Sequence, residues 1–118
     1  DSPCSGTGTL RRNPGMKWTV VPSMIDELNA KQQNILELYS QCVKPNGIVV
    51  YATCSLLRQE NENVVEQFLS THPNFVVEDF SAKLERYNIY LSPKKYFQLF
   101  PHIHNTDGFF AVVMRKVA

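Results

Sequence analysis

Apolar positions along the chain follow helical and strand spacings, and these divide it into segments. From about Ser23 to Val43 they recur every three to four residues, as on one face of an amphipathic helix. The predicted inward face of this helix comprises Leu28, Ile35, Leu36, Leu38, Tyr39, Cys42 and Val43. A second helix is predicted from about Gln59 to Thr71. Its predicted inward residues are Val64, Val65, Phe68 and Leu69.

Strand patterns follow the first helix. The turn sequence at 44–47 precedes IVVYAT at 48–53, a continuous apolar run typical of a strand buried on both faces of a parallel sheet. FVVEDF at 75–80 predicts a short strand, and YFQLF at 96–100 and FFAVVM at 109–114 predict two more. Helices and strands alternate early and strands cluster late, which predicts an α/β fold with an antiparallel strand pair at the C-terminal end.

Composition narrows the class of protein. The 118 residues suit one domain, and 43% of them are hydrophobic, which is enough for a core. The net charge of +1 does not indicate any particular class of binding partner. No apolar run is long enough to cross a membrane. Three cysteines without a Cys-x-x-Cys pair do not fit a disulfide framework or a zinc ribbon, and indicate free thiols in a reducing, intracellular setting. Because the sequence starts at Asp1, we expect a piece of a longer protein.

Two of the cysteines lie at positions typical of a catalytic or ligand-binding thiol. Cys54 follows the buried strand and precedes a helix, the place where α/β sheets bind ligands and where a helix N-terminus favours a thiolate. The alternative is a small buried apolar residue at a strand end. Cys4 lies in a Pro-Cys-Ser-Gly-Thr-Gly loop, where Gly6 and Gly8 would allow a close approach to a ligand. The alternatives are an ordinary turn, or a phosphate loop that lacks its lysine.

Three segments together carry a family resemblance. DSPCSGTGTLRR and YATCSLLRQENENVV resemble the fourth and sixth motifs of the RNA 5-methylcytosine methyltransferases, the Sun/Fmu/NSUN (RsmB-like) group. The tail FPHIHNTDGFFAVVMRK is similar to the closing strand pair of that family. Ser2 stands where the family often has alanine, and Arg58 where proline is frequent. Both departures are minor.

The resemblance implies a fold and a domain. Residues 1–118 would form the C-terminal half of a Rossmann-like class I methyltransferase sheet, in an S-adenosylmethionine-dependent catalytic domain. The cofactor residues of the family lie mostly upstream of Asp1, so none is assigned here. We therefore expect the isolated chain to bind S-adenosylmethionine weakly and to be inactive. It is also expected to self-associate through the exposed edge of the strand at 48–53.

The resemblance also implies a reaction. The enzyme would methylate carbon 5 of cytosine in RNA, with ribosomal RNA favoured over transfer RNA, in the cytoplasm, or in the nucleolus or mitochondrion of a eukaryote. Cys54 matches the family nucleophile, which attacks carbon 6 of the base. Cys4 matches the cysteine associated with product release. Asp1 matches the acid that would hydrogen-bond the cytosine edge, although an exposed terminal residue is the alternative.

Basic and aromatic residues of the N-terminal segment are candidates for binding RNA, since cations hold phosphates and indoles stack on bases. The predicted contacts are Pro3, Arg11, Arg12, Lys17 and Trp18, with Lys94 and Lys95 as a weaker patch. A core-edge anchor is the alternative for Trp18. Acidic residues are expected to face away from RNA at Glu60, Glu62, Glu66, Glu78 and Asp79. Asn61 is expected to organise the turn after Cys54.

Two other classes of function stay open. One is a cysteine hydrolase in which Cys54 pairs with His102 or His104, and the other is a non-catalytic RNA-binding module. The hydrolase needs an imidazole within hydrogen-bond reach of the thiol. The two histidines are too few ligands for a metal site, and none is expected.

Overall fold

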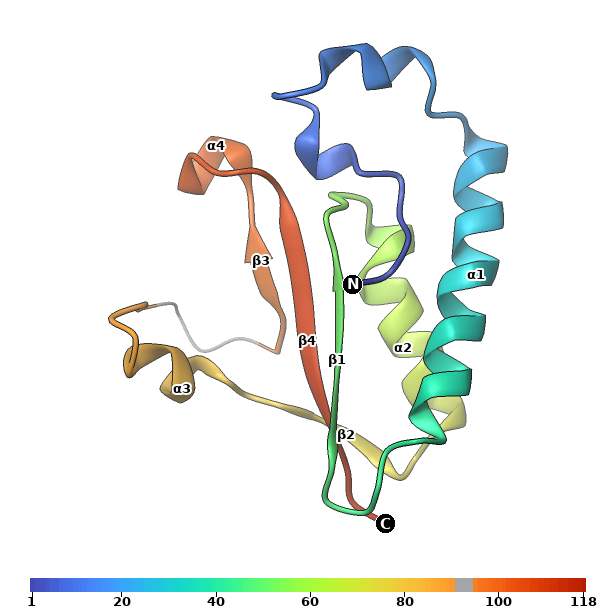
Figure 1. The fold of residues 1–118 in the computed structure, drawn as a ribbon, viewed down its shortest axis with the longest axis vertical. Coiled ribbons are helices and arrows are strands. Elements are labelled where there is room, and N and C mark those ends of the chain that lie inside the picture. Colours follow the sequence, from blue (N-terminus) through green and yellow to red (C-terminus); the bar gives the residue numbers. More distant parts are fainter. Residues whose placement is uncertain (91–94) are drawn as a thin grey trace.

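The computed structural model describes residues 1–90 and 95–118 as an α/β fold with two long helices beside a small sheet (Figure 1). The helices are α1 (Pro22–Ser40), α2 (Glu62–Thr71), α3 (Ser81–Glu85) and α4 (Pro101–His104). The strands are β1 (Ile48–Thr53), β2 (Phe75–Glu78), β3 (Phe97–Leu99) and β4 (Phe109–Lys116). Three 3-10 turns lie at Thr7–Thr9, Pro14–Trp18 and Arg58–Glu60. The predicted long helices and four strands are thus confirmed.

β4 is the centre of the sheet, and every described strand pairing is antiparallel. β1 runs along one edge of β4, from the Ile48–Arg115 pair to the Thr53–Phe110 pair. The other edge is shared, because β3 pairs with β4 at Phe109–Ala111 and β2 pairs with it at Val113–Lys116. The predicted pairing of the last two strands is confirmed, with α4 in the connection between them.

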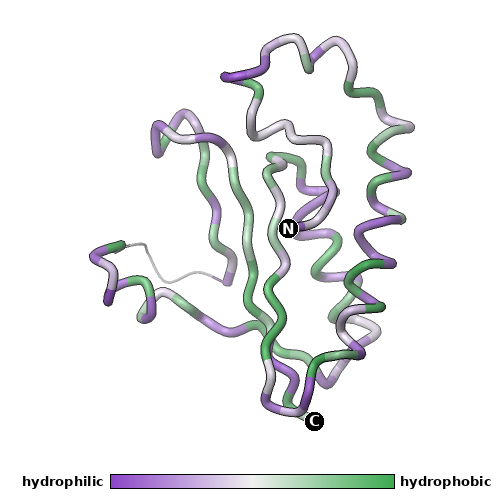
Figure 2. The backbone as a smooth tube through the Cα atoms, in the orientation of Figure 1, coloured by the Kyte–Doolittle hydropathy of each residue, from purple (hydrophilic) through white to green (hydrophobic). Residues whose placement is uncertain are grey.

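The core lies between one face of the sheet and the helices α1 and α2. Apolar side chains of both layers pack there, which removes them from water and stabilises the fold. The buried cluster comprises Leu36, Tyr51, Val64, Val65, Phe68, Phe75, Phe110, Val112 and Met114. Figure 2 shows the hydrophobic residues running along β1 and β4.

The other face of β1 is open, which corrects one expectation. The strand at 48–53 was expected to be buried on both faces within a parallel sheet, but β1 pairs antiparallel with β4 and alternates in exposure. Tyr51 and Thr53 are buried, whereas Ile48 and Val50 are 48% and 51% exposed. The reason is that α1 and α2 pack on the face that carries Tyr51 and Val112, whereas Ile48 and Val50 point to the opposite face. The expected self-association of the chain stays a prediction.

The exposed side of α1 corrects a second expectation. Leu38 and Tyr39 are 54% and 65% exposed, and Cys42, expected in the core, is also exposed. α1 ends at Ser40, so Cys42 lies beyond the helix in a turn. The buried face of α1 carries a polar residue, Gln32, which is fully buried. No described helix is long and apolar enough to cross a membrane.

Candidate active site

The two candidate thiols lie in contact, although 50 residues separate them in the chain. The Sγ atoms of Cys4 and Cys54 are 3.3 Å apart. The N-terminal segment runs beside the end of β1, where the Ser2 amide donates to the Ala52 carbonyl at 2.9 Å. The Gly8 amide donates to the Cys54 carbonyl at 2.8 Å. Both thiols are half-buried and reduced. The expectation that the loops carrying them are neighbours at the end of a strand is confirmed.

A crossing of three segments fixes the loop that carries Cys4. The Gly108 amide donates to the Gly8 carbonyl at 2.7 Å, so the turn before β4 closes over the loop. A Cβ on Gly8 would lie 2.4 Å from the Gly108 oxygen and 2.5 Å from the Cys54 oxygen. Only glycine fits there, because both neighbouring atoms belong to backbone that cannot rotate away.

A buried carboxylate, that of Glu60, forms hydrogen bonds to both loops that carry the cysteines. Glu60 is fully buried, and its Oε1 accepts from the Ser5 amide at 2.8 Å and from Gln32 Nε2 at 3.3 Å. Its Oε2 accepts from the Ser5 hydroxyl at 2.7 Å and from the Ser55 hydroxyl. Ser5 follows Cys4 and Ser55 follows Cys54. The expectation that Glu60 lies on an outward acidic face is therefore wrong.

Asn61 holds the turn after Cys54, as expected. The Thr53 hydroxyl donates to its Oδ1, and its Nδ2 donates to the Ser55 carbonyl at 2.8 Å. Thr7 adds a link between the loops, because its Oγ1 accepts from the Leu56 amide at 2.9 Å. Hydrogen bonds on either side of Cys54 thus fix its backbone.

The environment of Cys4 favours its neutral form. Burial raises the pKa of the Cys4 thiol to about 11, and the hydrogen bond with Cys54 acts in the same direction. Backbone hydrogen bonds from Gly6 and Cys54 lower that pKa, but by less. An unperturbed thiol has a pKa near ~8.5. Cys4 is therefore a thiol at neutral pH and can donate its proton to the Cys54 sulfur.

Four of the predicted RNA-binding residues lie in an exposed N-terminal arm at 11–21, namely Arg11, Arg12, Lys17 and Trp18. Arg11 and Arg12 each place Nε against the Asp107 carboxylate, at 3.1 and 2.6 Å. Lys17 Nζ lies 4.9 Å from the centre of the Trp18 ring, which is 80% exposed. Trp18 is thus no core-edge anchor, and the alternative considered for it is wrong.

Other predicted site residues are more loosely placed. Asp1 is exposed, and no hydrogen bond or ion pair joins its side chain to another residue of 1–90 or 95–118. Pro3 is exposed, and its carbonyl accepts from Gln32 Nε2 at 2.9 Å. His104 Nδ1 accepts from the Phe100 amide at 3.0 Å. Neither His102 nor His104 hydrogen-bonds a thiol within the described ranges.

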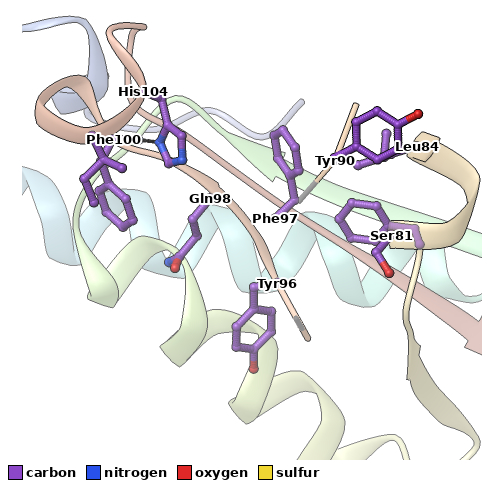
Figure 3. Close-up of a pocket in the computed structure, with 10 residues that line it drawn as sticks. Ser81, Leu84, Tyr90, Tyr96, Phe97, Gln98, Phe100 and His104 are labelled. Atoms are coloured by element: carbon purple, nitrogen blue, oxygen red, sulfur yellow. Dashed lines mark hydrogen bonds between the residues drawn. The ribbon is translucent and has the colours of Figure 1, made fainter. Parts of the chain in front are cut away.

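A pocket of about 340 Å³ lies apart from the thiols, between α3, β3 and α4. Figure 3 shows Phe97 and Gln98 of β3 in the middle, His104 at one end and Ser81 and Tyr90 at the other. Its lining includes neither Cys4 nor Cys54. Of the weaker candidate pair for RNA binding, Lys94 lies outside the described residues and Lys95 is exposed. Among the described residues, no group of three His, Cys, Asp or Glu side chains could hold a metal ion.

The sequence carried a signal for the residues that the motif analysis missed. Gln32 lies four residues after Leu28 and four before Leu36, so it interrupts the apolar face of α1 with an amide. A polar side chain at an inward position requires a buried partner, and here the amide nitrogen of Gln32 donates to Glu60 and to the Pro3 carbonyl. Ser5 and Ser55 gave no signal beyond their places next to the cysteines.

Known proteins share both the sequence and the geometry of this chain. It is 37% identical over 116 residues to a "Probable ribosomal RNA small subunit methyltransferase B" of Synechocystis, covering 98% of this chain and 26% of that protein. The chain thus spans about a quarter of the length of this curated relative.

Two crystal structures from Pyrococcus horikoshii are also similar. One is "NSun6 … with SFG", with a TM-score of 0.81, 27% identity, and coverage of 100% of this chain and 29% of that chain. The other is a "Methyltransferase Homolog Protein", with a TM-score of 0.73, 32% identity, and coverage of 97% and 36%. These likenesses confirm the expected Rossmann-like fold class.

The family model described as "16S rRNA methyltransferase RsmB/F" matches residues 1–115. This match covers both cysteine motifs and the closing strand pair, so the resemblance seen in the sequence is confirmed. The chain belongs to the RsmB/F family of 16S rRNA methyltransferases.

Proposed function

We propose that this chain is part of an RNA (cytosine-5) methyltransferase that acts on ribosomal RNA through a covalent adduct with Cys54. The observation that carries the proposal is the contact of 3.3 Å between Cys4 and Cys54, which come from two motif loops. A ribosomal substrate is supported by the family and by the printed name of the Synechocystis relative.

Two thiols are useful for this reaction because carbon 5 of cytosine is a weak nucleophile. In the proposed path the Cys54 thiolate forms a bond to carbon 6, and the ring becomes an enamine whose carbon 5 can accept a methyl group. Loss of the carbon 5 proton then lets the carbon–sulfur bond break, which restores the aromatic ring and the Cys54 thiolate. One difficult substitution is thereby divided into easier steps.

The raised pKa of Cys4 supports unequal roles for the thiols. Cys4 is protonated at neutral pH, which is consistent with assigning the attack on carbon 6 to Cys54, the cysteine that matches the family nucleophile. Cys4 first has to pass its own proton to solvent, and its thiolate is then a strong base that can take the carbon 5 proton. That property suits removal of the carbon 5 proton, which is the step that releases the product.

S-adenosylmethionine would supply an electrophilic methyl group in this proposal. The glycine loop beside Cys4 does not fit such a ligand, because the backbone of Gly108 and Cys54 already fills the space next to Gly8. The contacts to the cofactor are therefore assigned to residues other than this loop.

The N-terminal arm is proposed to bind RNA beside the thiols. Arg11, Arg12 and Lys17 would contact phosphates, and exposed Trp18 would stack on a base. Asp1 and Pro3 lie close to Cys4 in the chain, and Asp1 is proposed to contact the edge of the cytosine. The target base has to be unpaired or flipped out to reach Cys54.

The test compares single cysteine variants of the full-length protein with a cytosine-containing RNA. Cys54→Ala should abolish methylation and any covalent adduct on a denaturing gel, because the covalent route disappears. Cys4→Ala should accumulate the adduct, because its resolution is slow. The double variant should show no adduct.

The same gels separate the alternatives. An adduct that persists in Cys54→Ala and vanishes in Cys4→Ala would reverse the two roles. RNA binding that survives loss of both thiols, without methylation by the wild type, would indicate a binding module. Labelling of Cys54 by an acyl electrophile, with turnover that depends on His102 or His104, would indicate a hydrolase instead.

A further inference from the structure

We infer that Glu60 is a positioning residue that sets the distance between the Cys4 and Cys54 thiols. The inference rests on the proposed function for its catalytic consequence. Its structural part concerns the geometry of the two sulfur atoms and can be tested without RNA or cofactor. The hydrogen bonds of the Glu60 carboxylate go to other groups than the thiols, so it would act through the backbone and side chains of the residues that follow the cysteines.

The hydrogen bonds of Glu60 divide between the two loops. Ser5, next to Cys4, contributes both its amide and its hydroxyl, while Ser55, next to Cys54, contributes its hydroxyl. Both hydroxyls meet the same oxygen, Oε2. One carboxylate thus ties together segments that are 50 residues apart in the sequence.

The carboxylate is itself held in place by the core. The Tyr51 hydroxyl donates to the Glu60 carbonyl at 2.7 Å, which fixes the backbone below the side chain. Gln32, fully buried on α1, donates both to Glu60 Oε1 and to the Pro3 carbonyl. We call this hydrogen-bonded group the clamp; it comprises Glu60, Ser5, Ser55 and Gln32. The clamp is anchored to β1 through Tyr51 and to α1 through Gln32.

Burial makes Glu60 depend on its hydrogen bonds, because its carboxylate is removed from water. Glu60 is fully buried, and none of the described cationic side chains forms an ion pair with it. Its oxygens therefore depend on four hydrogen bonds from neutral donors. Burying a carboxylate without such bonds is costly, and polar networks of this kind fix one geometry when fully satisfied. A substitution that removes the acceptors leaves buried donors of both cysteine loops without partners.

Thiol chemistry depends steeply on this geometry. In the proposed reaction the Cys54 sulfur and the group that takes the carbon 5 proton must reach adjacent carbons of one ring. A displacement of about 1 Å can cost about 100-fold in rate. Loosening of the clamp should therefore slow turnover of bound RNA, with little change in KM for RNA, because the N-terminal arm lies outside the network.

The direct test measures how fast Cys4 and Cys54 form a disulfide, because this rate depends on the distance between the two sulfur atoms. The full-length protein is reduced, then treated with diamide, a diazene oxidant. Cys4 and Cys54 lose two hydrogens to its N=N bond, which becomes a hydrazine, while an S–S bond forms. The rate of this step is followed by mass spectrometry of the peptide pair. Wild-type protein should cross-link rapidly because the sulfurs start 3.3 Å apart.

The variants are graded by how much of the clamp they remove. Glu60→Ala removes every acceptor and should slow cross-linking by about 10- to 100-fold. Glu60→Gln keeps the shape and one acceptor oxygen, so it should recover part of the rate. Glu66→Ala on the exposed side of α2 is the matched control and should react like the wild type. Ser5→Ala combined with Ser55→Ala tests the clamp from its donor side, should Glu60→Ala fail to fold.

The outcomes are distinct. Folded Glu60→Ala, or the folded double serine variant, that cross-links at the wild-type rate would overturn the inference. Slow cross-linking with recovery in Glu60→Gln, together with lower kcat at unchanged KM, would support it. If cross-linking responds as expected but the wild type does not methylate RNA, the clamp stands and the proposed function fails.

Discussion

The two loops that carry the thiols and the N-terminal arm at 11–21 are built in opposite ways, although the arm directly follows the Cys4 loop in the sequence. The loops bury Ser5, Thr7, Ser55 and Glu60, and hydrogen bonds from other elements fix them. The arm has no buried residue, and Trp18 is 80% exposed. Its side-chain links to the body of the described fold are ion pairs of Arg11 and Arg12 with Asp107 and a hydrogen bond from Arg11 to Asn105.

The difference indicates a division of labour. Bond-making chemistry needs atoms held within a fraction of an ångström, which a buried and satisfied network provides. Binding a flexible polymer needs charge and stacking surface that can adjust, which exposed side chains provide. Substitutions in the loops should therefore change rates, whereas substitutions in the arm should change affinity.

The largest effect is expected from Gly8→Ala. Its new methyl group would meet the Gly108 and Cys54 carbonyl oxygens, so the loop that carries Cys4 has to move. We expect about 1–3 kcal/mol of destabilisation and about a 100-fold loss of methylation rate. Thermal unfolding and single-turnover methylation of the full-length protein measure the two effects.

Gly15→Ala is the matched control, because a Cβ there meets nothing within 4 Å. It lies in the arm and should change stability by less than about 0.5 kcal/mol. Equal losses in both glycine variants would contradict the contrast between a fixed loop and an adjustable arm.

A smaller effect, on affinity alone, is expected from Trp18→Ala. Loss of a stacking indole should weaken RNA binding by about 1–2 kcal/mol, within the range found for base–aromatic contacts. Unfolding temperature and diamide cross-linking should stay unchanged, because Trp18 contributes nothing to the core. Filter binding at fixed salt measures the affinity.

Tyr87→Ala removes an aromatic ring of similar exposure beside α3 and serves as the control. An affinity loss as large in Tyr87→Ala as in Trp18→Ala would mean that the arm is not the preferred RNA contact.

The smallest effect concerns pH. Since burial raises the pKa of Cys4 to about 11, its alkylation by iodoacetamide should gain rate well above pH 8.5. The raised pKa means that the folded state favours the protonated thiol. The stability this contributes is complete below about pH 8.5 and is lost as pH rises through about 11. Site-resolved mass spectrometry follows Cys4, and full reaction below pH 9 would refute the assignment.

Periodicity and motifs predicted much of the fold, because each depends on nearby residues. The spacing of Val64, Val65 and Phe68 predicts the buried face of α2, and the structure agrees. The same reasoning failed for Leu38 and Tyr39, because hydrophobic character alone does not tell which side of α1 meets the sheet. The apolar run at β1 was also interpreted as a strand of a parallel sheet, whereas β1 pairs antiparallel with β4. Such a run carries no information on strand direction.

The sequence predicted the two cysteines of the site but not the residues that hold them in place. Motifs predicted that Cys4 and Cys54 belong together, but the clamp depends on the tertiary fold. Glu60 follows Cys54 by six residues and was assigned to a solvated acidic face from local charge alone. Only the packing of α1 against the loops shows that Gln32 and Ser5 enclose it.

The central position of β4 has a consequence for how the molecule is made. β1, β2 and β3 each pair with β4, the most C-terminal of the described strands. On a ribosome, residues 48–99 are therefore synthesised before the strand that unites them exists. Pairing so distant in sequence forms slowly, and the open strand edges are available to chaperones or to other chains in the meantime. Gly108 directly precedes β4, so the loop that carries Cys4 stays uncapped until that part of the chain has been made.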